Sequence, residues 1–178
     1  MKPVKSITFC AVIAALSSVI MLASYIPYIT YASAALAGVL FIVPVIELSK
    51  PKAFLTFLVT AVFALLFAEP YSKVLFVCFF GYYPILKAVI EKIKNTALCV
   101  VFKLLCFNAA AVLSFFMLNF AVSIPFKEME FSNIYILGAV LVANIVFLLY
   151  DYGINGVVQF YMMRLHPTVY GMLKGNRR

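Results

Sequence analysis

Charged residues are scarce in this chain, and their scarcity excludes an ordinary water-soluble domain. Of 178 residues only 11% are charged, whereas 66% are apolar, and the mean hydropathy is +1.11. Soluble domains are about half apolar and about a quarter charged. A chain this short also has too much surface relative to its volume to hide so many apolar side chains from water. We therefore expect an integral membrane protein, with lipid covering much of its surface.

Residues that support catalysis or metal binding are also few. The chain has one histidine, His166, and six acidic residues, most of them dispersed near the ends of apolar runs. Intramembrane proteolysis needs a serine with a histidine, an aspartate pair or a zinc motif such as HExxH. Lipid-modifying transferases need several carboxylates to hold metal ions. We find none of these sets, and we expect no enzyme, no cofactor and no metal site.

Two features that would indicate a metal site or a nucleic-acid surface in a soluble protein have simpler explanations here. The four cysteines, Cys10, Cys78, Cys99 and Cys106, lie inside apolar runs without CxxC spacing, as small core- or lipid-facing residues do. The net charge of +8 comes from basic residues between the apolar runs, in no continuous stripe. We attribute it to the positive-inside bias of membrane proteins and expect no nucleic-acid binding.

Long apolar runs are what the sequence has in abundance. A bilayer core of about 30 Å needs about 20 apolar residues per helix, and six segments meet or approach that length. They are residues 7–26, 31–48, 53–68, 74–90, 97–122 and 133–150, the last with an extension to about Leu165. Their connections are brief and carry turn residues such as Pro27 and Pro51. We predict a single all-α domain over residues 1–178, an integral membrane bundle of six transmembrane helices.

The basic residues predict how these helices are oriented. If the N-terminus is cytoplasmic and there are six spans, twelve of the fourteen lysines and arginines fall on the inner side. Only Lys73 and Lys127 fall on the outer side. Basic residues favour cytoplasmic loops, and an odd number of spans would spoil the alternation. We therefore predict a multi-pass protein of the cell membrane with both termini in the cytoplasm.

Two irregularities are expected within the helices. Pro84 removes a helix hydrogen bond and predicts a kink near Tyr82–Tyr83 in the fourth span. Polar residues and glycines from Asp151 to Gly156 interrupt the last apolar run, which resumes at residue 157. This segment is either part of a long tilted sixth helix, which we favour, or a kink followed by an amphipathic helix on the inner leaflet.

Three ionisable residues are expected at a similar depth in the membrane. Asp151 lies near the cytoplasmic end of the sixth span, Lys103 about a turn inside the fifth, and Lys87 near the inner end of the fourth. A charge in lipid is costly unless it is paired. We predict an ion pair of Asp151 with Lys103 or Lys87. We interpret this ion pair as a structural contact that holds the helices together, with the lysines reaching toward the interface. A functional site is the alternative.

Other polar residues indicate helix pairing or a solute site. Asn108 and Asn144 fall near mid-membrane, where amides seek partners on neighbouring helices. Tyrosines and a few charges gather at the predicted outer ends, as in an aromatic belt or in a pocket for a flat polar solute. The sequence leaves both open. The candidate substrate-binding residues are Tyr28, Tyr31, Glu69, Lys73, Asn119 and Tyr135.

Small residues spaced by four give smooth helix faces that a neighbouring helix can approach closely. Ala11 and Ala15, followed by Ser18, form such a face on the first span, and Ala34 and Gly38 form another on the second. The partner at each face is either another helix of this chain or a separate subunit.

A chain of under 200 residues with six predicted helices, both ends inside and an AxxxA face (Ala11, Ala15) resembles the substrate-binding S components of energy-coupling factor transporters. The resemblance implies that the protein captures a vitamin or trace nutrient from outside. It also implies docking through Ala11, Ala15 and Ser18 onto a transmembrane coupling subunit driven by ATPases. The chain itself has no nucleotide-binding GxxxxGK(S/T) motif.

A structural scaffold is the alternative function. A small cell-envelope assembly protein of the rod-shape-determining kind would share the size, the helix number and the small-residue faces, without any solute. An outer cavity distinguishes the two classes, because a transport subunit needs one and a scaffold can be packed solid.

Overall fold

The computed structural model describes residues 3–122 and 133–174, and all the regular secondary structure in these ranges is helical. Six helical stretches are long and apolar enough to cross a membrane, which confirms the prediction at this level. They are Val4–Tyr25, Thr30–Glu47, Lys50–Phe67, Pro70–Ile90, Thr96–Phe120 and Leu137–Leu173. The predicted boundaries differ from these by a few residues, except at the end of the sixth helix, which continues well past Leu165.

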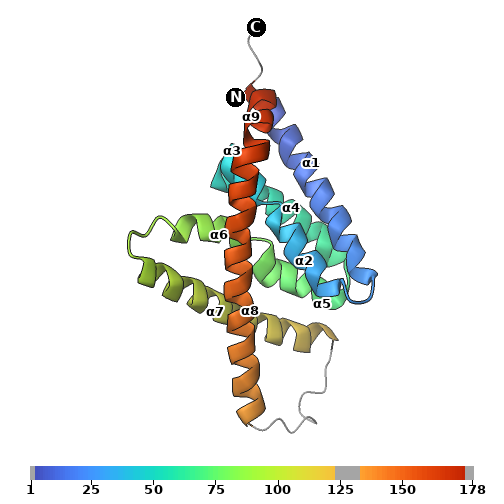
Figure 1. The fold of residues 1–178 in the computed structure, drawn as a ribbon. Coiled ribbons are helices and arrows are strands. Elements are labelled where there is room, and N and C mark those ends of the chain that lie inside the picture. Colours follow the sequence, from blue (N-terminus) through green and yellow to red (C-terminus); the bar gives the residue numbers. More distant parts are fainter. Residues whose placement is uncertain (1–2, 123–132, 175–178) are drawn as a thin grey trace.

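The two ends of the described chain lie together. Figure 1 shows the start of α1 (Pro3–Leu22) beside α9 (His166–Lys174). Lys5 Nζ donates a hydrogen bond to the carbonyl oxygen of Met172 across 3.2 Å. An even number of crossings returns a chain to the side on which it began, so this contact agrees with six spans.

The second span is not the single regular helix that the sequence predicted. It consists of α2 (Thr30–Val39) and α3 (Ile42–Glu47), separated by a tight turn. Pro44 is the physical reason, because its nitrogen cannot donate to the carbonyl of Leu40 and its ring clashes with that carbonyl. The Leu40 carbonyl instead accepts from Val43 N at 3.1 Å, three residues on rather than four.

The fourth span contains the expected irregularity. It begins as α5 (Pro70–Leu75), passes through a π-helical turn at Phe76–Phe80 and continues after Gly81 as α6 (Tyr83–Ile90). Pro84 lies in the first turn of α6, where a proline costs no intrahelical hydrogen bond. The helix is interrupted at Gly81 and Tyr82, next to the kink predicted near Tyr82–Tyr83, but Pro84 lies at the start of the following helix and does not bend a continuous one.

Close packing around this irregular span forms the first core. A side chain at Gly38 on α2 would collide with the backbone carbonyl of Phe80, so only glycine permits this approach. The ring of Phe57 on α4 (Lys50–Phe67) contacts those of Phe41 and Phe76. The buried members of this core are Met21, Ala34, Ala37, Phe41, Ala53, Phe57, Ala61, Ala64, Ala68, Phe76 and Ile85.

The last helix is continuous through the polar segment that interrupts its apolar run. α8 (Asn133–Phe160) leads through a π-helical turn at Tyr161–Leu165 into α9, as the favoured alternative predicted. Gly153 and Gly156 face open space and make no turn. A helix over residues 133–174 is about 63 Å long, which is about twice the length that one crossing of a core of about 30 Å requires. Figure 1 shows it crossing α7 (Thr96–Val122) obliquely.

A second core forms where the last two helices meet the fourth span. The stacked rings of Phe107 on α7 and Phe147 on α8 lie 4.6 Å apart between centroids, and Phe79 lies against both. The buried members of this core are Ile42, Phe79, Tyr83, Ala110, Phe147 and Ile154. The hydroxyl of Tyr83, a member of this core, donates a hydrogen bond to Asp151, which belongs to a cluster of charged residues.

Candidate functional site

Asp151 joins three helices through ionic contacts at one end of the second core. Its carboxylate lies on α8 and contacts Lys87 from α6 through Oδ1 and Lys103 from α7 through Oδ2, the latter at 2.9 Å. Lys87 Nζ also donates to the backbone carbonyl of Asp151 at 3.2 Å. The sequence predicted a pairing with one lysine or the other, and the structure contains both.

Glu91 and Tyr83 complete this cluster. Glu91 Oε1 lies 3.0 Å from Lys87 Nζ and 2.8 Å from Lys103 Nζ, so it bridges the two lysines. The hydroxyl of Tyr83 donates to Asp151 Oδ1 at 2.6 Å. Two ammonium groups thus face two carboxylates, and the cluster as a whole is neutral.

Burial makes these pairings energetically important. The side chains of Lys87 and Lys103 are only 4% and 10% exposed, that of Asp151 is 15% exposed, and that of Glu91 is 43% exposed. An unpaired charge at such a position is costly. Each of the four charges has a partner of opposite sign, so the cluster fastens α6, α7 and α8 together and presents no free base or nucleophile.

The lysines also control the ionisation of Glu91, which lies just beyond the fourth span. Burial alone would raise the pKa of this carboxyl, but the hydrogen bonds from Lys103 and Lys87 outweigh it and hold the pKa below its ordinary value. A lowered pKa in the folded state means that Glu91 stabilises the protein fully above the ordinary glutamate range, and that this stabilisation is lost as the pH falls through the lowered value.

We therefore expect the stability advantage of the native protein over E91Q to depend on pH. The advantage should be present at neutral pH and should shrink steadily below about pH 4.5, the ordinary value for glutamate. Thermal unfolding of both proteins in detergent, measured between neutral and acidic pH, checks this. A constant difference across that range would contradict the assignment.

A second polar contact joins the last two spans at mid-helix. Asn108 Nδ2 donates to Asn144 Oδ1 at 2.9 Å, and Asn144 Nδ2 donates back to Asn108 Oδ1 at 3.2 Å. Each amide also donates to the carbonyl four residues earlier on its own helix. Interhelical amide contacts of this kind contribute about 0.6–2 kcal/mol in a membrane, and packing explains both residues.

At the other end of the bundle, one candidate for solute binding has a structural role. Glu69 caps the N-terminus of α5, because its Oε2 accepts from the backbone nitrogens of Tyr71 and Ser72 at 2.8 and 2.9 Å. The hydroxyls of Ser72 and Ser33 lie 3.1 Å apart nearby. Lys73, one turn into α5, is partly buried.

The remaining candidates whose side chains the structure describes are exposed residues on separate elements. Tyr28 is fully exposed in the turn before α2 and has a positive φ of 72°, which is strained for a bulky residue. Tyr31 is exposed at the start of α2, and Asn119 is exposed near the end of α7. The position of the Tyr135 side chain lies outside the described part of the structure, as does Lys127.

The two sides of α1 differ in what they contact. Ala14, Ser17 and Met21 are buried against the rest of the bundle, and Ser17 Oγ donates to the carbonyl of Ala37 on α2 at 3.0 Å. By contrast, Ala11 and Ala15 are exposed and Ser18 is half-buried. The small-residue face at Ala11 and Ala15 is therefore not used to pack the helices of this chain.

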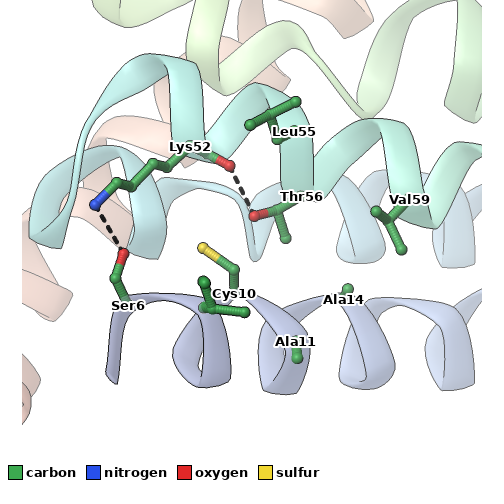
Figure 2. A pocket seen from close by; sticks show the side chains of 9 residues that line it. Ser6, Cys10, Ala11, Ala14, Lys52, Leu55, Thr56 and Val59 are labelled. Carbon is green, nitrogen blue, oxygen red and sulfur yellow. Dashed lines mark hydrogen bonds between the residues drawn. The ribbon is translucent and has the colours of Figure 1, made fainter. Parts of the chain in front are cut away.

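A groove of about 450 Å³ runs between the first half of α1 and the first half of α4. Figure 2 shows small residues along its α1 side and Leu55, Thr56 and Val59 along its α4 side. At one end, Lys52 Nζ donates to Ser6 Oγ across 2.9 Å. The residues lining the groove are Ser6, Ile7, Cys10, Ala11, Ala14, Lys52, Leu55, Thr56 and Val59.

A smaller cavity of about 130 Å³ adjoins the charge cluster. Its walls include Lys87, Glu91, Ile154 and Val158. Both cavities lie toward the end of the bundle that holds the termini, because their lining residues are near the start of α1 and α4 and near the end of α6. Neither involves the tyrosine-rich end.

One buried cluster was missed by the sequence analysis. The carboxylate of Glu47, at the end of α3, is fully buried and accepts from the hydroxyl of Tyr161 at 2.7 Å; His166 Nδ1 lies 2.7 Å from the same oxygen. Tyr161 is the first residue of the π-helical turn Tyr161–Leu165, and His166 directly follows that turn. The signal in the sequence was a lone histidine following an apolar run, without any indication of its partner.

Within the described ranges, no group of three or more histidine, cysteine, aspartate and glutamate side chains is placed to hold a metal ion. Comparison with protein-family models, with curated proteins and with solved structures finds no match to this chain.

Proposed function

We propose that the protein is the membrane-embedded substrate-binding subunit of a vitamin or micronutrient uptake transporter, similar to the S components of energy-coupling factor systems. It resides in the cell membrane with both termini in the cytoplasm. It captures a small solute at the tyrosine-rich outer end. Separate subunits supply the energy, because the chain carries no nucleotide-binding loop of its own.

The exposed face of α1 is the observation that carries this proposal. Small residues in membrane helices serve close helix approach. On α1 those at positions 14 and 17 are used inside the bundle, whereas Ala11 and Ala15 remain exposed beside large apolar neighbours such as Val12 and Leu16. A coupling subunit that docks at this face would use the small side chains that this chain itself leaves unpacked.

A structural scaffold is the second candidate, and the arrangement of the outer end favours it. Glu69 is held as a helix cap, and the hydroxyls of Ser33 and Ser72 contact each other. Both cavities described above lie at the opposite end. A scaffold needs the docking face on α1 but no solute, so the presence of a bound solute separates the two functions.

Native mass spectrometry of the protein purified in mild detergent tests this directly. We expect a vitamin-sized molecule that stays bound in the folded state and is released on denaturation. Y31A should lose it, whereas the matched control Y25A, a similarly exposed tyrosine outside the candidate site, should retain it. If the native protein retains no solute and binds none from a vitamin panel, the scaffold function is favoured instead.

A further inference from the structure

We propose that the groove between α1 and α4 binds an anionic phospholipid, with one acyl chain along the groove and the phosphate at Lys52. This site is separate from solute capture and from docking at Ala15, whereas Ala11 belongs both to the groove and to the proposed docking face. Three features carry it: the apolar lining, the width of the groove, and a cation with a hydroxyl at one end.

The lining suits a hydrocarbon chain. On the α1 side, Cys10, Ala11 and Ala14 are too small to fill the space between the helices, and Leu55 and Val59 wall the other side. A groove left empty would forfeit dispersion contacts along its whole length. Its volume of about 450 Å³ is within the usual range for small-molecule sites.

The width of the groove favours a chain over a helix. Neighbouring helix axes lie about 8–10 Å apart, whereas a helix with its side chains is about 10–12 Å across. α1 and α4 are in direct contact through Ser6 and Lys52, so the groove between them is narrower than a third helix. A flexible acyl chain fits such a groove, and from Ser6 to Ala14 it would follow about 12 Å of α1.

The polar end of the groove suits a phosphate. Lys52 is exposed and lies near the start of its span, at the depth where headgroups begin. An ammonium group has three donors, and the hydrogen bond to Ser6 Oγ occupies one of them. No acidic residue lines the groove. Lys5 immediately precedes Ser6 on α1 and is a second basic residue near this end. Anionic lipids are concentrated in the cytoplasmic leaflet, where the basic residues place this end of the bundle.

The experiment compares two lipids that have the same acyl chains but headgroups of different net charge. Dioleoyl phosphatidylglycerol and dioleoyl phosphatidylcholine are added to delipidated protein in detergent, and bound lipid is counted by native mass spectrometry. We expect the native protein to favour the glycerol lipid by about fivefold, the contribution of one lysine near an anionic headgroup. K52Q should lose this preference, and C10L should weaken the binding of both lipids.

Two controls make the test specific. K94Q removes an exposed lysine at the same end of the bundle but outside the groove, and it should keep the preference. A15L alters the proposed docking face without touching the groove, so it should leave lipid binding unchanged even if it abolishes uptake. Equal affinity of the native protein for both lipids, an equal loss in K94Q and K52Q, or a partner protein held in the groove would overturn the proposal.

Discussion

Replacing Asp151 by asparagine is expected to destabilise the protein by about 3 kcal/mol. The side chain keeps its size but loses the charge that faces Lys87 and Lys103, both of which are almost fully buried. Removing one partner of a buried ion pair costs about 3–5 kcal/mol, because the other charge is left without compensation. Glu91 still contacts both lysines, which places the effect at the lower end of that range.

A second substitution distinguishes loss of charge balance from loss of packing. The double variant D151N/K103M is again neutral, since Lys87 retains Glu91 at 3.0 Å, and we expect it to recover much of the lost stability. Y83F removes one hydrogen bond to the charged Asp151 carboxylate and should cost about 1.5 kcal/mol, the low end for such a bond, because both lysines stay in place.

Heat resistance of a fluorescent-protein fusion, followed by gel filtration in detergent, measures these differences; the chain has no tryptophan to report unfolding itself. A D151N variant as stable as the native protein would contradict the account of the cluster. The account would also be contradicted if the stability loss of D151N/K103M equalled the sum of the losses in D151N and K103M, because the two charges would then be uncoupled.

Leucine at Ala11 or Ala15 is expected to abolish solute uptake by cells while leaving solute binding by the purified protein intact. The added branches occupy the space into which a helix of the coupling subunit would pack. Both positions are exposed in this chain, so neither change disturbs its own core. Uptake of labelled solute, measured beside binding to the purified variants, separates the two effects.

L16F is the matched control for this docking experiment. Leu16 is exposed on the same helix but points about 100° away from Ala15 and about 140° away from Ala11, and its substitution should leave uptake unchanged. Normal uptake by both A11L and A15L would remove the docking role, and loss of binding along with uptake would indicate misfolding instead.

The number of helices could be predicted from the sequence because bilayer thickness imposes a length on each apolar run. The details inside the helices could not be. Pro44 splits the second span through its clash with the Leu40 carbonyl, which is a local signal that the hydropathy pattern hides. The π-helical turn at Phe76–Phe80 arises within a packed region where Gly38 and Phe57 press against the fourth span, and no local pattern indicates it.

The charge cluster was partly predictable for a similar reason. Counting residues along each span places Asp151, Lys87 and Lys103 at a similar depth in the membrane. Charges at that depth require partners of opposite sign. Glu91 was missed because it follows the fourth apolar run, although its spacing of four from Lys87 was visible. Glu47 and His166 are 119 residues apart, and their contact depends on how α9 packs beside α3.

The sequence around Glu69 allowed two interpretations of this residue, as a solute contact or as a helix cap. Proline is common at the first helical position, so Pro70 marks Glu69 as the N-cap position. The structure places Glu69 in that role. A charged residue that caps a helix is therefore a weaker candidate for solute contact than a charged residue with no such capping role.

Reporter fusions test the central claim, a six-span membrane protein with both ends in the cytoplasm, most directly. A green fluorescent protein or an alkaline phosphatase is attached after Arg178 and, in separate fusions, after Ala68 between the third and fourth spans. We predict fluorescence without phosphatase activity at Arg178, and phosphatase activity without fluorescence at Ala68. The reverse pattern at either position, or a fusion protein that remains soluble without detergent, would contradict the account.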